Sequence, residues 1–222
     1  MKSVATLYQS TIGKKVLMAV SGAAIFGYLV VHMIGNLQIF LGPEVINKYA
    51  ALLHGTPILL WGVRIVLLLA FPVHIAMAIQ LNARNRKARP VAYASYKRNV
   101  SSYAARTMMF SGPILLVFLL FHLAHLTLGY NVVPTKFIEG DPYGNMINGF
   151  SVSWVFFFYV LAASLVGLHM AHGSWSMFQT LGVSHPRYNA LIKEVGFVAT
   201  VVVAGGFALV PLAVFLKLIG GP

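Results

Sequence analysis

Apolar residues gather in five long stretches along the chain, and each stretch contains only a few polar positions. A helix needs about 20 mostly apolar residues to cross the hydrocarbon core of a membrane. The stretches that meet this length lie at residues 17–41, 58–82, 107–130, 153–178 and 196–219. The pattern therefore predicts an all-α integral membrane protein with five transmembrane helices, forming one domain over residues 1–222.

The segment before the first apolar stretch looks in part like a secretory signal. Its basic residues Lys14 and Lys15 come late, however, and the apolar run that follows them is longer than the core of such a signal. We expect residues 2–15 to form a short amphipathic segment on the membrane surface. The first span would then be retained.

Composition narrows the function classes. Of the 222 residues, 59% are hydrophobic, 9% are charged and none is cysteine. A chain without cysteine holds no disulfide, iron–sulfur cluster, zinc–thiolate site or covalently attached haem. The net charge of +12 in so apolar a chain points to anionic membrane lipid or an acidic partner protein, and not to nucleic acid.

Basic residues are distributed unevenly between the two sides of the predicted spans, which sets their orientation. Twelve lie on the side of the N-terminus: Lys2, Lys14, Lys15, Arg84, Arg86, Lys87, Arg89, Lys97, Arg98, Arg106, Arg187 and Lys193. Four lie on the other side: Lys48, Arg64, Lys136 and Lys217. The asymmetry predicts a cytoplasmic N-terminus and an external C-terminus.

Six of the eight histidines fall inside the first four spans, and the fifth span has none: His32, His74, His122, His125, His169 and His172. Polar side chains are costly inside a membrane, so they usually face the interior of the helix bundle and serve a function. A single such histidine is readily explained by a hydrogen bond between helices. Six together, distributed in this way, indicate a shared chemical role.

Four of these histidines form two pairs, because the members of each pair lie at the same expected depth in the membrane. His32 and His122 each lie about fifteen residues from the cytoplasmic start of their spans, or roughly 22 Å up at 1.5 Å per residue. His74 and His169 lie about 12–14 Å from the cytoplasmic side. Two pairs at two heights, each on alternate helices, are what two stacked haems with two histidine ligands each require. Within the third and fourth spans, His125 and His172 lie one turn from His122 and His169 and remain alternative ligands.

On these features the chain resembles the cytochrome b membrane subunit of succinate dehydrogenase and fumarate reductase, in its five-helix form with two haems. The resemblance covers nearly the whole chain. Its main segments are STIGKKVLMAVSG (10–22), HMIGNLQIFLGPEVINKYA (32–50), LLWGVRIVLLLAFPVH (59–74), SGPILLVFLLFHLAHLT (111–127) and LHMAHGSWSMFQTLG (168–182).

The resemblance implies a distal haem b between His32 and His122 and a proximal haem b between His74 and His169. His125 and His172 then become residues that support these ligands. The resemblance also implies a flavoprotein and an iron–sulfur subunit on the cytoplasmic face of a bacterial inner membrane, and a membrane quinone, with menaquinone favoured. The chain would carry electrons between the iron–sulfur subunit and the quinone, without acting on succinate itself.

One departure from the family concerns proton movement. Some fumarate reductases of this form carry a glutamate in the fourth span just before the haem ligand, where this chain has Gly167, and none of the five spans contains an acid. A quinone reduced near the distal haem would then take protons from the outer side. The candidates there for binding quinone or a haem propionate are His54, Glu44 and Arg64, although Arg64 is equally explained by a position at the membrane interface beside Trp61.

Two other functions are compatible with the pattern. The first is a cytochrome b that serves a hydrogenase or a formate dehydrogenase. The second is a transporter without haem, in which the histidines relay protons.

Overall fold

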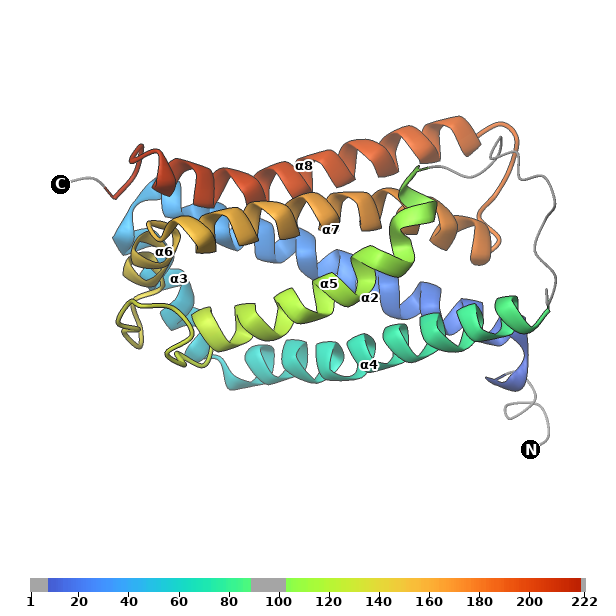
Figure 1. Cartoon of the computed structure of the whole chain (residues 1–222), viewed down its shortest axis with the longest axis horizontal. Coiled ribbons are helices and arrows are strands. Elements are labelled where there is room, and N and C mark those ends of the chain that lie inside the picture. The colour runs from blue at the N-terminus through green and yellow to red at the C-terminus, as the bar shows by residue number, and fades with distance from the viewer. Residues whose placement is uncertain (1–7, 89–102, 221–222) are drawn as a thin grey trace.

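Five long helices run side by side along the molecule, and the described chain begins at one end of the bundle and finishes at the other (Figure 1). The computed structural model describes residues 8–88 and 103–220. The long helices are α2 (Thr11–Leu37), α4 (Pro57–Lys87), α5 (Tyr103–Leu126), α7 (Ser153–Thr180) and α8 (Asn189–Phe215). All five are long and apolar enough to cross a membrane. The prediction of an all-α, multi-pass membrane protein is therefore confirmed.

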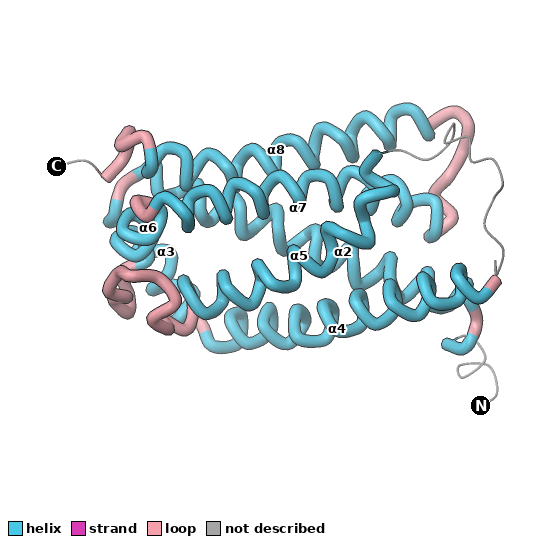
Figure 2. Tube along the Cα trace, in the orientation of Figure 1, coloured by secondary structure: helices cyan, strands magenta, loops and turns pink. Residues whose placement is uncertain are grey.

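Two short helices and a 3-10 turn lie at the end of the bundle opposite the N-terminus, which we call the capped end (Figure 2). They are η1 (Gln38–Leu41), α3 (Pro43–His54) and α6 (Pro142–Phe150). Both short helices begin with a proline in their first turn, where the missing N–H costs no hydrogen bond. The Asp141 side chain caps α6 by accepting from the backbone N–H of Gly144 at 3.0 Å. Neither short helix was among the elements predicted from the sequence, because only long apolar stretches were expected to be helical.

The first long helix begins earlier than the sequence predicted. Ser10 is its N-cap, and the Ser10 hydroxyl accepts a hydrogen bond from the backbone N–H of Gly13 at 2.8 Å. The residues from Thr11 to Lys15 therefore form the first turn of α2 instead of a separate surface segment. Residues 1–7 lie outside the described part of the chain.

The helices pack as two antiparallel pairs, α2 with α4 and α5 with α7. Helix α8 packs along α7 and also contacts α2, so it joins the two pairs on one side. Small residues allow this close approach: a Cβ added to Gly196 on α8 would stand 3.0 Å from the Ser174 hydroxyl oxygen on α7. The fifth span, which has no histidine, thus packs against the spans α2 and α7.

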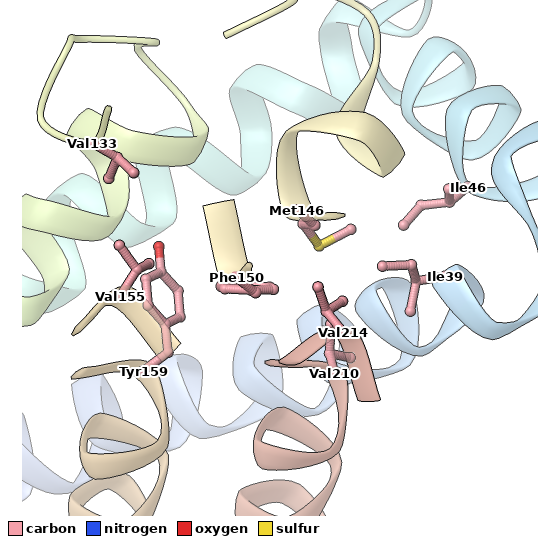
Figure 3. Packing of buried hydrophobic residues seen from close by; sticks show 9 residues of the cluster. All are labelled: Ile39, Ile46, Val133, Met146, Phe150, Val155, Tyr159, Val210 and Val214. Carbon is pink, nitrogen blue, oxygen red and sulfur yellow. The ribbon is translucent and has the colours of Figure 1, made fainter. Parts of the chain in front are cut away.

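The largest group of buried apolar side chains lies at the capped end, where α3, α6, α7 and α8 meet (Figure 3). Met146 and Phe150 of α6 reach into it, and Val210 and Val214 of α8 close it from another side. Tyr159 of α7 is the polar member of this group. Its ring stands beside Val155 with the hydroxyl at the far end (Figure 3).

Candidate functional site

The first histidine pair lies toward the capped end and joins α2 to α5. The imidazole rings of His32 and His122 have centroids 5.7 Å apart, and their planes are at 81°. The two helices that carry them belong to different antiparallel pairs. The side chains therefore meet across the interior of the bundle.

The second pair lies toward the N-terminal end and joins α4 to α7. The rings of His74 and His169 have centroids 6.1 Å apart. A Cβ added to Gly22 of α2 would stand 3.1 Å from Cε1 of His74, so the absence of a side chain at Gly22 lets the ring approach α2. His32 lies ten residues beyond Gly22 on the same helix, which separates the two pairs by roughly 15 Å in height.

Hydrogen bonds to Nδ1 orient both rings of the second pair. Nδ1 of His74 lies 3.1 Å from the backbone oxygen of Met18. Because a carbonyl oxygen only accepts, Nδ1 of His74 carries the hydrogen and donates it. Nδ1 of His169 lies 3.4 Å from the Ser111 hydroxyl, which can donate its own hydrogen to the backbone oxygen of Met108 at 3.4 Å and accept from the ring.

Tyrosine hydroxyls take the corresponding place at the first pair. The Tyr159 hydroxyl lies 3.3 Å from Nδ1 of His122, and the Tyr28 hydroxyl lies 3.5 Å from Nδ1 of His32. All four paired histidines thus have an oxygen beside Nδ1. Among the described residues, no hydrogen bond is made to Nε2 of any of the four. Metal-binding histidines in proteins have this arrangement, in which one ring nitrogen is held by an oxygen and the other is free to coordinate.

His125 and His172 differ from the paired histidines. His125 is 5% exposed, and its Nδ1 lies 3.0 Å from the Tyr159 hydroxyl. Its Nε2 faces α6 so closely that a Cβ added to Gly149 would stand 2.6 Å away. His172 is half-buried on α7. Nε2 of His125 therefore lacks the space that a metal ligand needs. His172, unlike the four paired rings, has no oxygen hydrogen-bonded to its ring among the described residues.

Two ligands per site favour a macrocycle over a bare metal ion. The described part of the chain has no group of three or more histidine, aspartate or glutamate side chains that would hold an ion. Zinc sites, in comparison, usually take three or four protein ligands. A metal–imidazole bond is about 2.0–2.1 Å long and the nitrogen lies roughly 1 Å from the ring centre, so two imidazoles on opposite faces of a haem have centroids about 6 Å apart. The two observed separations are close to this value, so the residues fit the group.

Two glycines close in sequence to Ser111 and His169 have open space at the position of a Cβ. A Cβ added to Gly112, next to Ser111 on α5, would meet no atom within 4 Å, and the same is true of Gly173 on α7. Glycines at such places let a flat cofactor approach the helix backbone.

The three residues expected to bind quinone or a propionate on the outer side do not converge. Glu44 forms an exposed ion pair with Lys48 at 3.7 Å, one helical turn away on α3. His54 is exposed at the end of the same helix. Arg64 lies over the ring of Trp61 on α4, 5.2 Å from its centroid, as expected of a residue at the membrane interface.

Basic residues at the N-terminal end help to join the first two spans. The guanidinium of Arg84 donates to the backbone oxygen of Gln9 at 2.7 Å and to the Thr11 hydroxyl at 3.2 Å. Lys14 is 4% exposed, and its ammonium group donates to the Gln80 side chain. The basic residues of the connection between α4 and α5 from 89 to 102 lie outside the described residues.

Sequence reasoning missed the oxygen partners of the paired histidines. Tyr28 lies four residues before His32, so its place on the same helix face was visible in the sequence. Ser111 and Tyr159 come from other helices and gave no such signal. Comparison of the chain with protein-family models, curated proteins and solved structures gives no match.

Proposed function

We propose that this chain is a dihaem cytochrome b, the electron-carrying membrane subunit of a succinate:quinone oxidoreductase. The observation that carries the proposal is the shared geometry of the two histidine pairs. In each pair the rings meet across the bundle, Nδ1 faces an oxygen, and Nε2 makes no hydrogen bond to any residue of the described chain. Two haems b, one held by each pair, would supply one-electron transfer between the two faces of the membrane.

The residues of the chain would hold and orient this pair of cofactors. His32 and His122 would ligate the distal haem, and His74 and His169 the proximal haem. The oxygens of Met18 and Ser111 would keep Nδ1 protonated at the proximal site, which directs the lone pair of Nε2 toward the iron. In a membrane the apolar helices would keep water from both sites, and burial is one of the means by which a protein sets a haem potential.

The expected orientation of the spans gives the side on which the partner subunits would dock. The N-terminal end carries most of the basic residues and would face the cytoplasm of a bacterium, where a flavoprotein and an iron–sulfur subunit would dock. The capped end would face outward, and the quinone, with menaquinone favoured, would react on that side. The chain alone would not act on succinate.

The experiment that tests the cofactors is a spectrum of the protein purified in detergent. We expect a b-type α-band in the dithionite-reduced minus oxidised difference spectrum, and a pyridine haemochrome assay that gives two haems per chain. A purified, folded protein without this band would exclude the proposal and favour a histidine-containing transporter. Copurification of a flavoprotein would support the succinate and fumarate complex, whereas copurification of a hydrogenase or formate dehydrogenase would overturn that part.

A further inference from the structure

The Tyr159 hydroxyl stands between two histidines of α5. It lies 3.3 Å from Nδ1 of His122 and 3.0 Å from Nδ1 of His125. Tyr159 is 8% exposed, and Phe118, Phe121 and Phe150 surround its ring with centroids 5.0, 6.1 and 4.8 Å away. Its hydroxyl is therefore held in place by packing.

Counting the available hydrogens shows which group donates in each of these two hydrogen bonds. A hydroxyl has one hydrogen to donate, and a neutral imidazole carries one N–H. If His122 coordinates iron through Nε2, its hydrogen is on Nδ1 and is donated to the Tyr159 oxygen. The Tyr159 hydrogen then goes to Nδ1 of His125, which must be the unprotonated nitrogen of that ring.

The second nitrogen of His125 is consistent with this direction. The hydrogen of His125 must be on Nε2, which faces the backbone of α6 at Gly149. A ring packed this closely against a helix has no room for a haem on that nitrogen. His125 is thus an acceptor for Tyr159 and not an alternative to His122.

The proximal pair has no equivalent relay. Nδ1 of His74 donates directly to a backbone carbonyl, and Ser111 serves His169 without a further ring. Among the described residues, His172 makes no hydrogen bond of the kind that His125 makes. The relay through a tyrosine is therefore particular to the distal pair.

We propose that Tyr159 and His125 are positioning residues for the ligand His122, with Tyr159 accepting from His122 Nδ1 while it donates to His125 Nδ1. This inference rests on the proposed function. An acceptor at Nδ1 makes an imidazole ligand more basic, and a more basic ligand favours the oxidised iron. Tyr159 would therefore lower the reduction potential of the distal haem and leave that of the proximal haem unchanged.

The test is Tyr159→Phe in the full-length chain with both haems bound. We expect two haems per chain, a higher midpoint potential for the distal haem, a changed low-temperature electron paramagnetic resonance signal from that haem, and an unchanged proximal haem. The distal signal is assigned by its loss in His32→Ala. Tyr143→Phe is the matched control, because Tyr143 packs against the same apolar cluster and its hydroxyl makes no hydrogen bond among the described residues.

Two substitutions at His125 test the direction of the relay. His125→Leu removes the acceptor for Tyr159 and should shift the distal potential in the same direction as Tyr159→Phe. His125→Asn keeps an acceptor oxygen and should stay closer to the wild type. These variants also carry the test if Tyr159→Phe does not fold. Ser111→Ala should move the proximal haem alone.

The outcomes separate the two proposals. A wild-type protein without b-type haem overturns the proposed function. A wild-type protein with two haems, whose distal potential and resonance signal are the same in Tyr159→Phe and His125→Leu, overturns the positioning role and leaves the proposed function standing. Loss of the distal haem in His125→Asn with retention in His122→Ala would show that His125 is the ligand.

Discussion

The His74 ring lies directly against the backbone of Gly22. A Cβ at Gly22 would stand 3.1 Å from Cε1 and 3.3 Å from Nδ1 of His74. One turn before Gly22, the backbone oxygen of Met18 lies 3.1 Å from the same Nδ1. Helix α2 thus positions a histidine that belongs to α4, through the space at one residue and the carbonyl of another.

This contact predicts that Gly22→Val removes the proximal haem. A branched side chain at Gly22 would displace the His74 ring and break its hydrogen bond to Met18. We expect the haem content of the purified protein to fall by about half, with the distal haem retained. The pyridine haemochrome assay and the resonance signals of the two haems measure this.

Gly27→Val is the matched control for that variant. Gly27 is on the same helix, is exposed, and has no atom within 4 Å of the position its Cβ would take. It should retain both haems. Equal loss in the two variants would show that a β-branched residue in α2 is harmful in itself, and that Gly22 has no particular role at His74.

The ligand pairs predict a pattern of non-additive losses. His32→Ala and His122→Ala should each remove the distal haem, and the double variant should lose no more than either single one, because under the proposed function both residues would ligate the same iron. His74→Ala and His169→Ala should behave likewise at the proximal site. The measurement is haem content with the potential of the remaining haem.

A double variant with one substitution in each pair tests which histidines share a haem. A chain with His32→Ala and His74→Ala together should bind no haem with two histidine ligands. If that double variant retained one haem of unchanged potential, the pairing of α2 with α5 and of α4 with α7 would be incorrect.

The close contact between Gly149 and His125 predicts that a larger residue at position 149 destabilises the capped end. In Gly149→Ala the new Cβ would stand 2.6 Å from Nε2 and Cε1 of His125. Overpacking a buried contact typically costs about 1–3 kcal/mol. We therefore expect a lower thermal unfolding temperature in detergent. Gly205→Ala on α8 is the control, because its Cβ would meet no atom within 4 Å; a fall of equal size there would contradict this explanation.

The hydrogen bond from Lys14 to Gln80 predicts that substitutions of its two partners lower stability by different amounts. Gln80→Leu leaves the buried ammonium group of Lys14 without its side-chain acceptor, and an unsatisfied buried group costs about 1–3 kcal/mol, more when it is charged. Lys14→Met removes the charge and keeps the length of the side chain, so the loss should be much smaller. Thermal unfolding of the two single variants and the double variant checks this, and a larger loss in Lys14→Met would contradict it.

The spans could be predicted from the sequence because the membrane imposes one simple requirement on length and polarity. The predicted stretch at 153–178 and the observed helix Ser153–Thr180 differ by two residues at one end. The helix ends at the N-terminal end of the bundle were less predictable. Helix α4 (Pro57–Lys87) continues five residues beyond the predicted end at residue 82. Outside the hydrocarbon, a charged segment can be either helix or loop, so the loss of apolar residues does not mark where the helix ends.

The short helices at the capped end were missed although local signals existed. Asp141 followed by Pro142 is a typical helix start, with a capping side chain and then a residue that needs no N–H partner. In a search for long apolar stretches, such a segment counts only as a polar connection.

The two histidine pairs illustrate what depth alone can and cannot predict. Counting residues placed His32 level with His122, and the structure brings those rings together. The choice between His122 and His125 depends on the rotation of α5 about its axis and on the side chains that reach it from α6 and α7. Those contacts are set by packing between helices, so Tyr159 could not be assigned from its place in the sequence.

The ten-residue interval between Gly22 and His32 has a consequence for how such a chain can vary. Helix α2 contacts both histidine pairs, at Gly22 and through His32. The number of residues between these two positions therefore sets the distance between the pairs along the bundle. Inserting a single residue there would turn His32 by about 100° away from His122 while raising it by only about 1.5 Å. The distance between the two sites can therefore change only in steps of three or four residues, about 4.5 or 6 Å, which return His32 to nearly the same face of the helix.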